Sequence, residues 1–216
     1  MNAITFESTA NEDIPAVVRR GGYSTPVWIQ SKWTDGEFAH YIQKNGCGHC
    51  CTAMAAQLHG VDIDPYREYV LCRELWGPPR EEHGQDHFIT VSGIVKVLSS
   101  LGINAACFGV DDQSRGFDHI IRSLKEEKLV IFVSDPFRDV DNPFSTGYHY
   151  VMALGLNEDG NVLIANSSEK VTRGGIQIVS PNDVCKALYQ GGTADMSMTW
   201  GVVEELNKGC TYVIVG

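Results

Sequence analysis

The chain has 216 residues, of which 20% are charged and 43% hydrophobic, and its formal net charge is −10 at pH 7. This length suits one large domain with a sizeable core, so disulfides are not needed for stability. The negative charge argues against nucleic acid or an anionic membrane as a partner, and no stretch is long and apolar enough to span a bilayer. Residues 1–7 have neither a basic start nor an apolar run, so we expect no signal peptide and a cytoplasmic protein.

The predicted elements change from helices to strands along the chain. Residues 1–22 are polar and end at Gly21-Gly22, so we expect an N-terminal arm, loose or lying on the body as a strand, before a single domain over 23–216. A loop is expected at 34–46. Helices are predicted at about 48–59, 65–76, 91–101, 116–127 and 181–189. Strands are predicted at 103–110, 129–133, 148–156, 161–166, 176–179 and 210–215. Helices followed by a mostly antiparallel sheet indicate an α+β fold, with a site expected at the seam between them.

Three of the seven cysteines, Cys47, Cys50 and Cys51, fall within five residues at a predicted helix start. Downstream, Cys51, Met54 and Leu58 recur at the helical period, which indicates a helix with an apolar face. Unpaired N–H groups and the helix dipole at that end stabilise an anion, and they lower the pKa of a thiol placed there. This is the setting that a cysteine nucleophile needs.

A base for this thiol is predicted at His149. His149 begins one predicted strand and Asn166 ends the next, and an Asp-Gly turn joins the two strands. Antiparallel pairing brings both residues to the same end of the hairpin, and adjacent strands lie about 4.8 Å apart, so one side chain can reach the other. The amide oxygen of Asn166 could then accept a hydrogen bond from the imidazole and fix its tautomer.

Four motifs in chain order resemble a known family. They are Gln30-Ser31-Lys32-Trp33, Gly46-Cys47-Gly48 with Met54, Gly147-Tyr148-His149, and Asn166. The order Cys, His, Asn is that of papain-like cysteine peptidases. More narrowly, residues 26–180 resemble the bacterial peptidase family related to the double-glycine leader peptidases of bacteriocin export.

The resemblance implies a papain-like fold and a cysteine peptidase or amidase that needs no cofactor or metal and acts on a peptide or amide substrate. It implies that Cys47 is the nucleophile, that His149 and Asn166 complete the triad, and that Gln30 donates its side-chain amide to the oxyanion together with the Cys47 N–H. This chain departs from the family where Pro-Thr-Ser is replaced by His49-Cys50-Cys51. The membrane domain and ATPase of the transporter-fused members are also absent from it, so double-glycine specificity is not carried over.

Alternatives arise from the same residues. Cys50 is a rival nucleophile, since Cys-Gly-His-Cys is similar to the Cys-Gly-Ser-Cys of papain. The same four residues also resemble the motif of thiol-disulfide oxidoreductases, although no apolar strand precedes them. A catalytically silent peptide-binding relative is a third reading. His83 and His87 are spaced like metal ligands but lie in a predicted loop. The remaining cysteines, Cys72, Cys107, Cys185 and Cys210, are predicted to be single buried thiols in a reducing compartment.

Overall fold

The computed structural model describes residues 4–76, 89–109, 113–135, 142–169, 174–188 and 210–216. The chain has an α+β fold built on a six-stranded sheet in the order β4-β9-β5-β6-β7-β8, and every neighbouring pair is antiparallel. The strands are β4 (Ala105–Phe108), β5 (Leu129–Ser134), β6 (His149–Leu156), β7 (Val162–Asn166), β8 (Gly175–Val179) and β9 (Tyr212–Val215). The α+β prediction is therefore confirmed, and β9 lies inside the sheet between β4 and β5.

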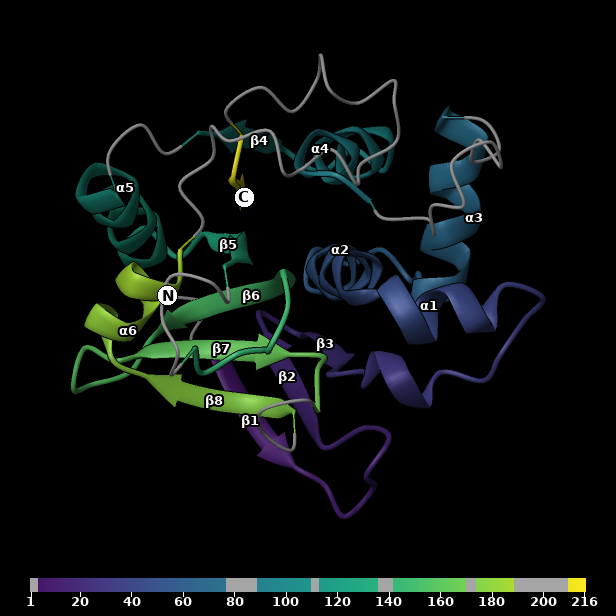
Figure 1. Ribbon diagram of the computed structural model, residues 1–216, viewed down its shortest axis with the longest axis horizontal. Coiled ribbons are helices and arrows are strands. Elements are labelled where there is room, and N and C mark those ends of the chain that lie inside the picture. The colour runs from purple at the N-terminus through teal and green to yellow at the C-terminus, as the bar shows by residue number, and fades with distance from the viewer. Residues whose placement is uncertain (1–3, 77–88, 110–112, 136–141, 170–173, 189–209) are drawn as a thin grey trace.

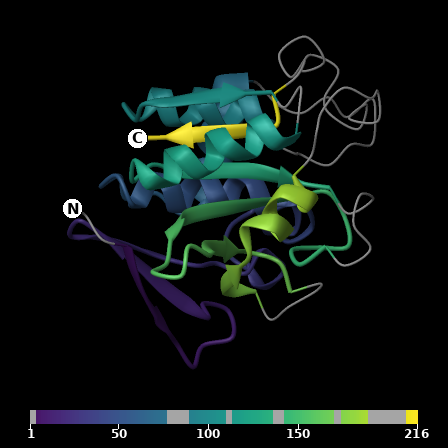
Figure 2. The ribbon, with the colours of Figure 1, turned by 90° about the vertical axis from the view of Figure 1, so that its left-hand side faces the viewer.

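Helices cover both faces of this sheet (Figures 1 and 2). The helices are α1 (Ala39–Asn45), α2 (Cys47–Gln57), α3 (Pro65–Trp76), α4 (Val91–Ser100), α5 (Gln113–Lys125) and α6 (Pro181–Ala187). A larger apolar cluster joins α2, α3 and α4 to one face, and a second cluster joins α5 and α6 to the other. Side chains that alternate along β6 supply both clusters, since Met152 belongs to the first and Val151 to the second.

Helix α2 is the buried centre of the first layer. All residues from Cys47 to Ala56 are buried, so the helix is enclosed on every side, whereas the sequence pattern predicted a single apolar face. It packs against α3, α4 and β6. The first residue of α2 is Cys47, as expected for a thiol at a helix N-terminus.

The expected loop over 34–46 is partly wrong, because its second half forms α1. This helix buries Ile42 and Asn45 and ends at Gly46, whose N–H donates to the Ile42 carbonyl at 2.8 Å. A short 3-10 turn, η1 (Gln30–Lys32), precedes it. Packing of Ile42 into the core stabilises a helix whose polar sequence, read alone, resembles a loop.

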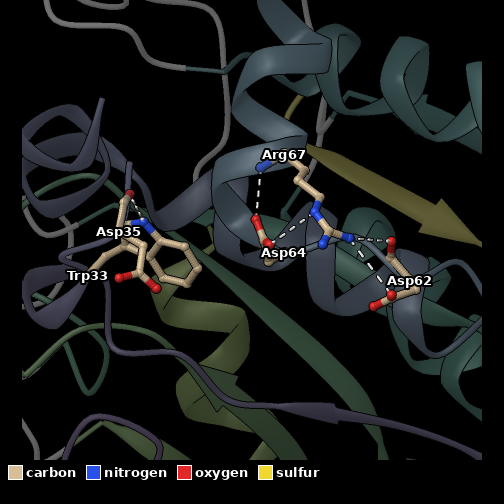
Figure 3. Close-up of polar contacts among 5 residues, drawn as sticks. All are labelled: Trp33, Asp35, Asp62, Asp64 and Arg67. Atoms are coloured by element: carbon tan, nitrogen blue, oxygen red, sulfur yellow. Dashed lines mark hydrogen bonds and ion pairs between the residues drawn. The ribbon is translucent and has the colours of Figure 1, made fainter. Parts of the chain in front are cut away.

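Helix α3 begins as the sequence predicts, with Asp64 as its N-cap and Pro65 in the first position. The Asp64 Oδ1 atom accepts from the Arg67 N–H at 2.8 Å, and the Arg67 guanidinium also lies 3.4 Å from Asp64 Oδ2 and 3.7 Å from Asp62 Oδ2 (Figure 3). In the same view the Trp33 indole N–H donates to the Asp35 carbonyl at 2.8 Å. The contacts of Arg67 with Asp62 and Asp64 fix the start of the helix that carries Glu68.

A separate three-stranded antiparallel sheet forms at the N-terminus. Its strands are β1 (Ile4–Ser8), β2 (Ala16–Arg20) and β3 (Tyr23–Pro26). Gly21-Gly22 is the two-residue turn between β2 and β3, with φ angles of 56° and 92° that favour glycine. The boundary expected between an arm and a domain at residues 22 and 23 falls in this turn.

The predicted hairpin forms from β6 and β7. The turn is closed by Gly160 N–H donating to the Asn157 carbonyl at 3.0 Å, and Gly160 has a φ of 80°. His149, the first residue of β6, and Asn166, the last of β7, therefore lie at the same end of the hairpin. This end of the two strands lies beside α2 (Figure 1). Among the helices of the described ranges, none combines the length and the apolarity needed to cross a bilayer.

Candidate active site

The start of α2 is held tightly by the two glycines that flank Cys47. A Cβ atom on Gly46 would lie 2.3 Å from the Ile42 carbonyl oxygen. A Cβ atom on Gly48 would lie 2.3 Å from Ile89 Cγ2 and 3.1 Å from Tyr150 Cδ2. The absence of a Cβ atom therefore lets α1 run directly into α2 at Gly46, and at Gly48 it lets the helix start lie against Ile89 and against Tyr150 of β6. Cys47, which is 5% exposed, is thereby placed next to the contact with Tyr150, the residue that follows His149.

His149 and Asn166 meet directly. His149 Nε2 lies 2.8 Å from Asn166 Oδ1, and both side chains are buried. The same Oδ1 atom accepts from the Ser168 N–H at 2.9 Å, whereas Asn166 Nδ2 donates to the Phe144 carbonyl at 3.1 Å and to Gln177 Oε1 at 3.2 Å. These partners determine which end of the amide is oxygen, so Asn166 must accept from the histidine.

The hydrogen bond fixes the histidine tautomer. Because Asn166 Oδ1 can only accept, His149 carries a proton on Nε2, and in the neutral ring Nδ1 holds the lone pair. A base at this site would therefore act through Nδ1. A neutral amide partner orients the ring without adding a charge that would hold a second proton on it.

The loop before His149 is ordered by Asn142, which the sequence analysis did not single out. Asn142 Oδ1 accepts from the Phe144 N–H at 2.9 Å, and its Nδ2 donates to the Asp135 carbonyl at 3.0 Å. This fixes the backbone of Phe144, whose carbonyl supports Asn166. Gln177 was also missed, and it donates to the Pro143 carbonyl at 3.2 Å while accepting from Asn166.

Gln30 lies between the end of β7 and the end of α1, which form the two walls of the candidate site. Its backbone N–H donates to the Ser167 carbonyl at 3.0 Å, and the Ser167 hydroxyl lies 3.5 Å from Gln30 Oε1. Its side-chain Nε2 donates to the Lys44 carbonyl at 3.4 Å, at the end of α1 just before Cys47. Gln30 is thus joined on one side to the neighbour of Asn166 and on the other to the helix end that precedes Cys47.

Cys50 and Cys51 lie deeper in the core than Cys47. Both are fully buried, and this burial raises the pKa of each thiol well above its usual value. The negative charge that a Cys47 thiolate would carry raises both further. They are therefore protonated packing residues at neutral pH, which disfavours Cys50 as a nucleophile.

In the segment His49-Cys50-Cys51, where the sequence departs from the family motif, His49 has a buried partner in α3. His49 Nδ1 is hydrogen-bonded to Glu68 Oε2 of α3, with both side chains buried. Burial raises the pKa of Glu68, and the interaction with His49 opposes that increase. Glu68 Oε1 finds no partner within the described residues. The sequence held a signal, since Glu68 lies on the buried stripe of Pro65, Tyr69 and Cys72 at the helical period.

The other readings of the cysteine motif find less support in the geometry. Residues before Cys47 form α1 and not a strand, and Cys50 is fully buried. All seven cysteines lie within the described residues, and none is in a disulfide. Of the four cysteines predicted to be single and buried, only Cys72 is buried, and Cys107 contacts Cys210.

A metal site is likewise not apparent in the ranges described. No group of three or more His, Cys, Asp or Glu side chains there could hold a metal ion. The pair His83 and His87 lies outside those ranges.

Comparison with known protein families and with curated proteins finds no match. Among solved structures, the chain is similar to a double glycine motif protease from an AMS/PCAT transporter in complex with the leader peptide, at 13% identity and a TM-score of 0.41, over 67% of this chain and 79% of that one. It is also similar to a protein from Bacillus anthracis described as a C39-like peptidase, at 13% identity and a TM-score of 0.45, over 80% of this chain and 89% of that one. These are proteins of the kind that the sequence motifs resemble.

Proposed function

We propose that this protein is a cysteine-dependent hydrolase that acts on a peptide or amide bond. The observation that carries the proposal is the His149–Asn166 hydrogen bond, because it orients an imidazole with its Nδ1 lone pair at the end of the sheet on which the Cys47 helix start rests. A nucleophile, a base and a group that orients the base are the parts that covalent acyl chemistry requires.

In the proposed mechanism His149 Nδ1 takes the proton of Cys47, and the thiolate is stabilised by the imidazolium and by the N-terminus of α2. The Cys47 sulfur attacks the substrate carbonyl. His149 then gives its proton to the leaving amine, and a thioester remains on Cys47. Water, deprotonated by His149, attacks the thioester and restores the thiol.

Gln30 is proposed to stabilise the oxyanion of each tetrahedral intermediate with its Nε2–H, together with the Cys47 backbone N–H. The long contacts of Nε2 to the Lys44 and Gln43 carbonyls, 3.4 and 3.5 Å, are weak enough to be exchanged for a developing oxyanion. Its position between the two walls supports this role.

The test is alkylation with iodoacetamide at pH 6, followed by mass mapping of all seven cysteines. We expect Cys47 to react first, because the proposed proton transfer to His149 leaves its thiolate populated at a pH where thiols without such a base stay protonated. A His149→Ala variant should lower the Cys47 alkylation rate at least about tenfold, since the imidazolium that stabilises the thiolate is lost.

Cys50→Ser is the matched control and should leave the Cys47 rate unchanged. Preferential labelling of another cysteine would refute the nucleophile assignment. Hydrolysis of a peptide amide library that survives in Cys47→Ala would refute the mechanism.

A further inference from the structure

Cys107 and Cys210 are two neighbouring thiols that lie outside the α2 motif. Their sulfurs lie 3.2 Å apart, although the residues are 103 positions apart in sequence. Cys107 is on β4, and Cys210 comes two residues before β9. Both residues are half-buried, so neither is enclosed in the core.

The backbone around the pair is already in place. Cys107 is paired with Val213 in the β4–β9 ladder, and the Thr211 N–H donates to the Phe108 carbonyl at 2.7 Å. This hydrogen bond extends the pairing to the residue next to Cys210. The two strands lie side by side at one end of the sheet (Figures 1 and 2). The sulfurs need to approach by only about 1 Å to reach a bonded separation.

We propose that Cys107 and Cys210 form a reversible disulfide when the protein meets a small-molecule disulfide such as oxidised glutathione. This inference is independent of the proposed hydrolase function. The bond would link β4 to the chain entering β9, and it would close a loop that contains His149 and Asn166.

The chemistry assigns different roles to the two thiols. Burial, together with the hydrogen bond and charge of Cys107, raises the pKa of the Cys210 thiol to about 12, and Cys210 donates its S–H to Cys107. Cys210 therefore keeps its proton at neutral pH, and the first attack is assigned to the Cys107 sulfur.

The Cys107 sulfur bonds to one sulfur of the small disulfide, whose S–S bond breaks and releases one thiolate. The Cys210 sulfur then attacks Cys107, gives up its proton, and displaces the second small thiol. The two protein thiols lose two electrons in total, the small disulfide gains them, and the two thiol protons end on the released thiols.

The experiment incubates the full chain in glutathione buffers of increasing oxidised fraction, blocks remaining thiols, and maps the digest by mass spectrometry. We expect one linked peptide pair joining Cys107 to Cys210, with the loss of two hydrogens, and its reversal by reduced glutathione. Cys107→Ser and Cys210→Ser should each abolish this pair. Cys185→Ser, which removes another half-buried thiol, should leave it intact.

The oxidised protein should also unfold at a higher temperature, by about 5 °C or more, because the cross-link closes a long loop in the unfolded chain. Absence of the linked pair at every glutathione ratio, or a dominant link that involves another cysteine, would overturn the proposal. A linked protein whose unfolding temperature is unchanged would overturn the stabilising effect.

Discussion

Two buried histidines of this protein have hydrogen-bond partners of different charge. His149 donates to the neutral amide of Asn166 at the end of the sheet, whereas His49 is bonded to the carboxylate of Glu68 between α2 and α3. Asn166 is held by three further hydrogen bonds, while one Glu68 oxygen has no partner in the described residues.

The two partners suit different roles for the two rings. An amide fixes which ring nitrogen carries the proton, and it leaves the imidazole able to gain and lose a second proton. The Glu68 carboxylate joins His49 of α2 to α3 through a buried hydrogen bond. This agrees with the proposed proton transfer by His149, whereas the contact of His49 attaches the Cys47-bearing helix to α3.

The largest effect is expected from separating His49 and Glu68. His49→Ala should lower the free energy of unfolding by about 3–5 kcal/mol, because it leaves the Glu68 carboxylate buried and uncompensated. The double variant His49→Leu with Glu68→Leu should recover most of this loss, since a buried pair replaced by apolar side chains is often neutral. Urea unfolding of the unchanged protein, the single variant and the double variant measures the loss and its recovery. A single variant that costs under about 1 kcal/mol would contradict the attachment role.

The cost of His49→Ala should also depend on pH. The pKa of Glu68 in the folded protein is already raised above its ordinary value of 4.5, and losing His49 removes an interaction that lowers it. A raised folded-state pKa gives stability that is complete below 4.5 and is lost as the pH rises through the folded pKa. The loss should therefore be larger at pH 8 than at pH 5. In a Glu68→Gln background this pH dependence should disappear, and its persistence there would point to another group.

The second effect comes from giving His149 the kind of partner that His49 has. In Asn166→Asp the carboxylate favours the imidazolium, so the pKa of His149 should rise by about 1–3 units relative to the unchanged protein. NMR titration of the His149 ring measures this directly, best in a Cys47→Ala background that removes coupling to the thiol. Asn166→Ala, which offers no acceptor, should give no such rise. An unchanged or lowered value in Asn166→Asp would contradict the direct contact.

The sequence predicted the His149–Asn166 pair and not the His49–Glu68 pair for a physical reason. The first depends on a local hairpin whose turn and alternation are written in consecutive residues, around Gly160. The second depends on how α2 and α3 are rotated against each other, which periodicity does not specify. The same limit applies to Cys107 and Cys210, which meet because β9 enters the sheet between β4 and β5.

The misassigned α1 has a related cause. Its seven residues include few strong apolar positions, and Ile42 provides most of the burial that stabilises the helix. Short helices gain most of their stability from tertiary packing, so their own sequence predicts them poorly. Cys47, in contrast, was placed correctly at the helix start, because Gly46 and Gly48 mark the turn and the following residues repeat at the helical period.

The smallest effect tests how Asn166 is supported. Gln177→Ala removes one of the two acceptors of Asn166 Nδ2 and leaves the Phe144 carbonyl in place. We expect a loss of about 0.5–1.5 kcal/mol in the free energy of unfolding, the usual net value of one hydrogen bond. The Cys47 alkylation rate should change less than in Asn166→Ala, because Asn166 Oδ1 still accepts from His149 and from the Ser168 N–H. Urea unfolding and timed iodoacetamide labelling of both variants make the comparison. If Gln177→Ala matched Asn166→Ala in both measurements, Gln177 rather than the Phe144 carbonyl would be the main support of the amide, and the loop fixed by Asn142 would matter less than its hydrogen bonds indicate.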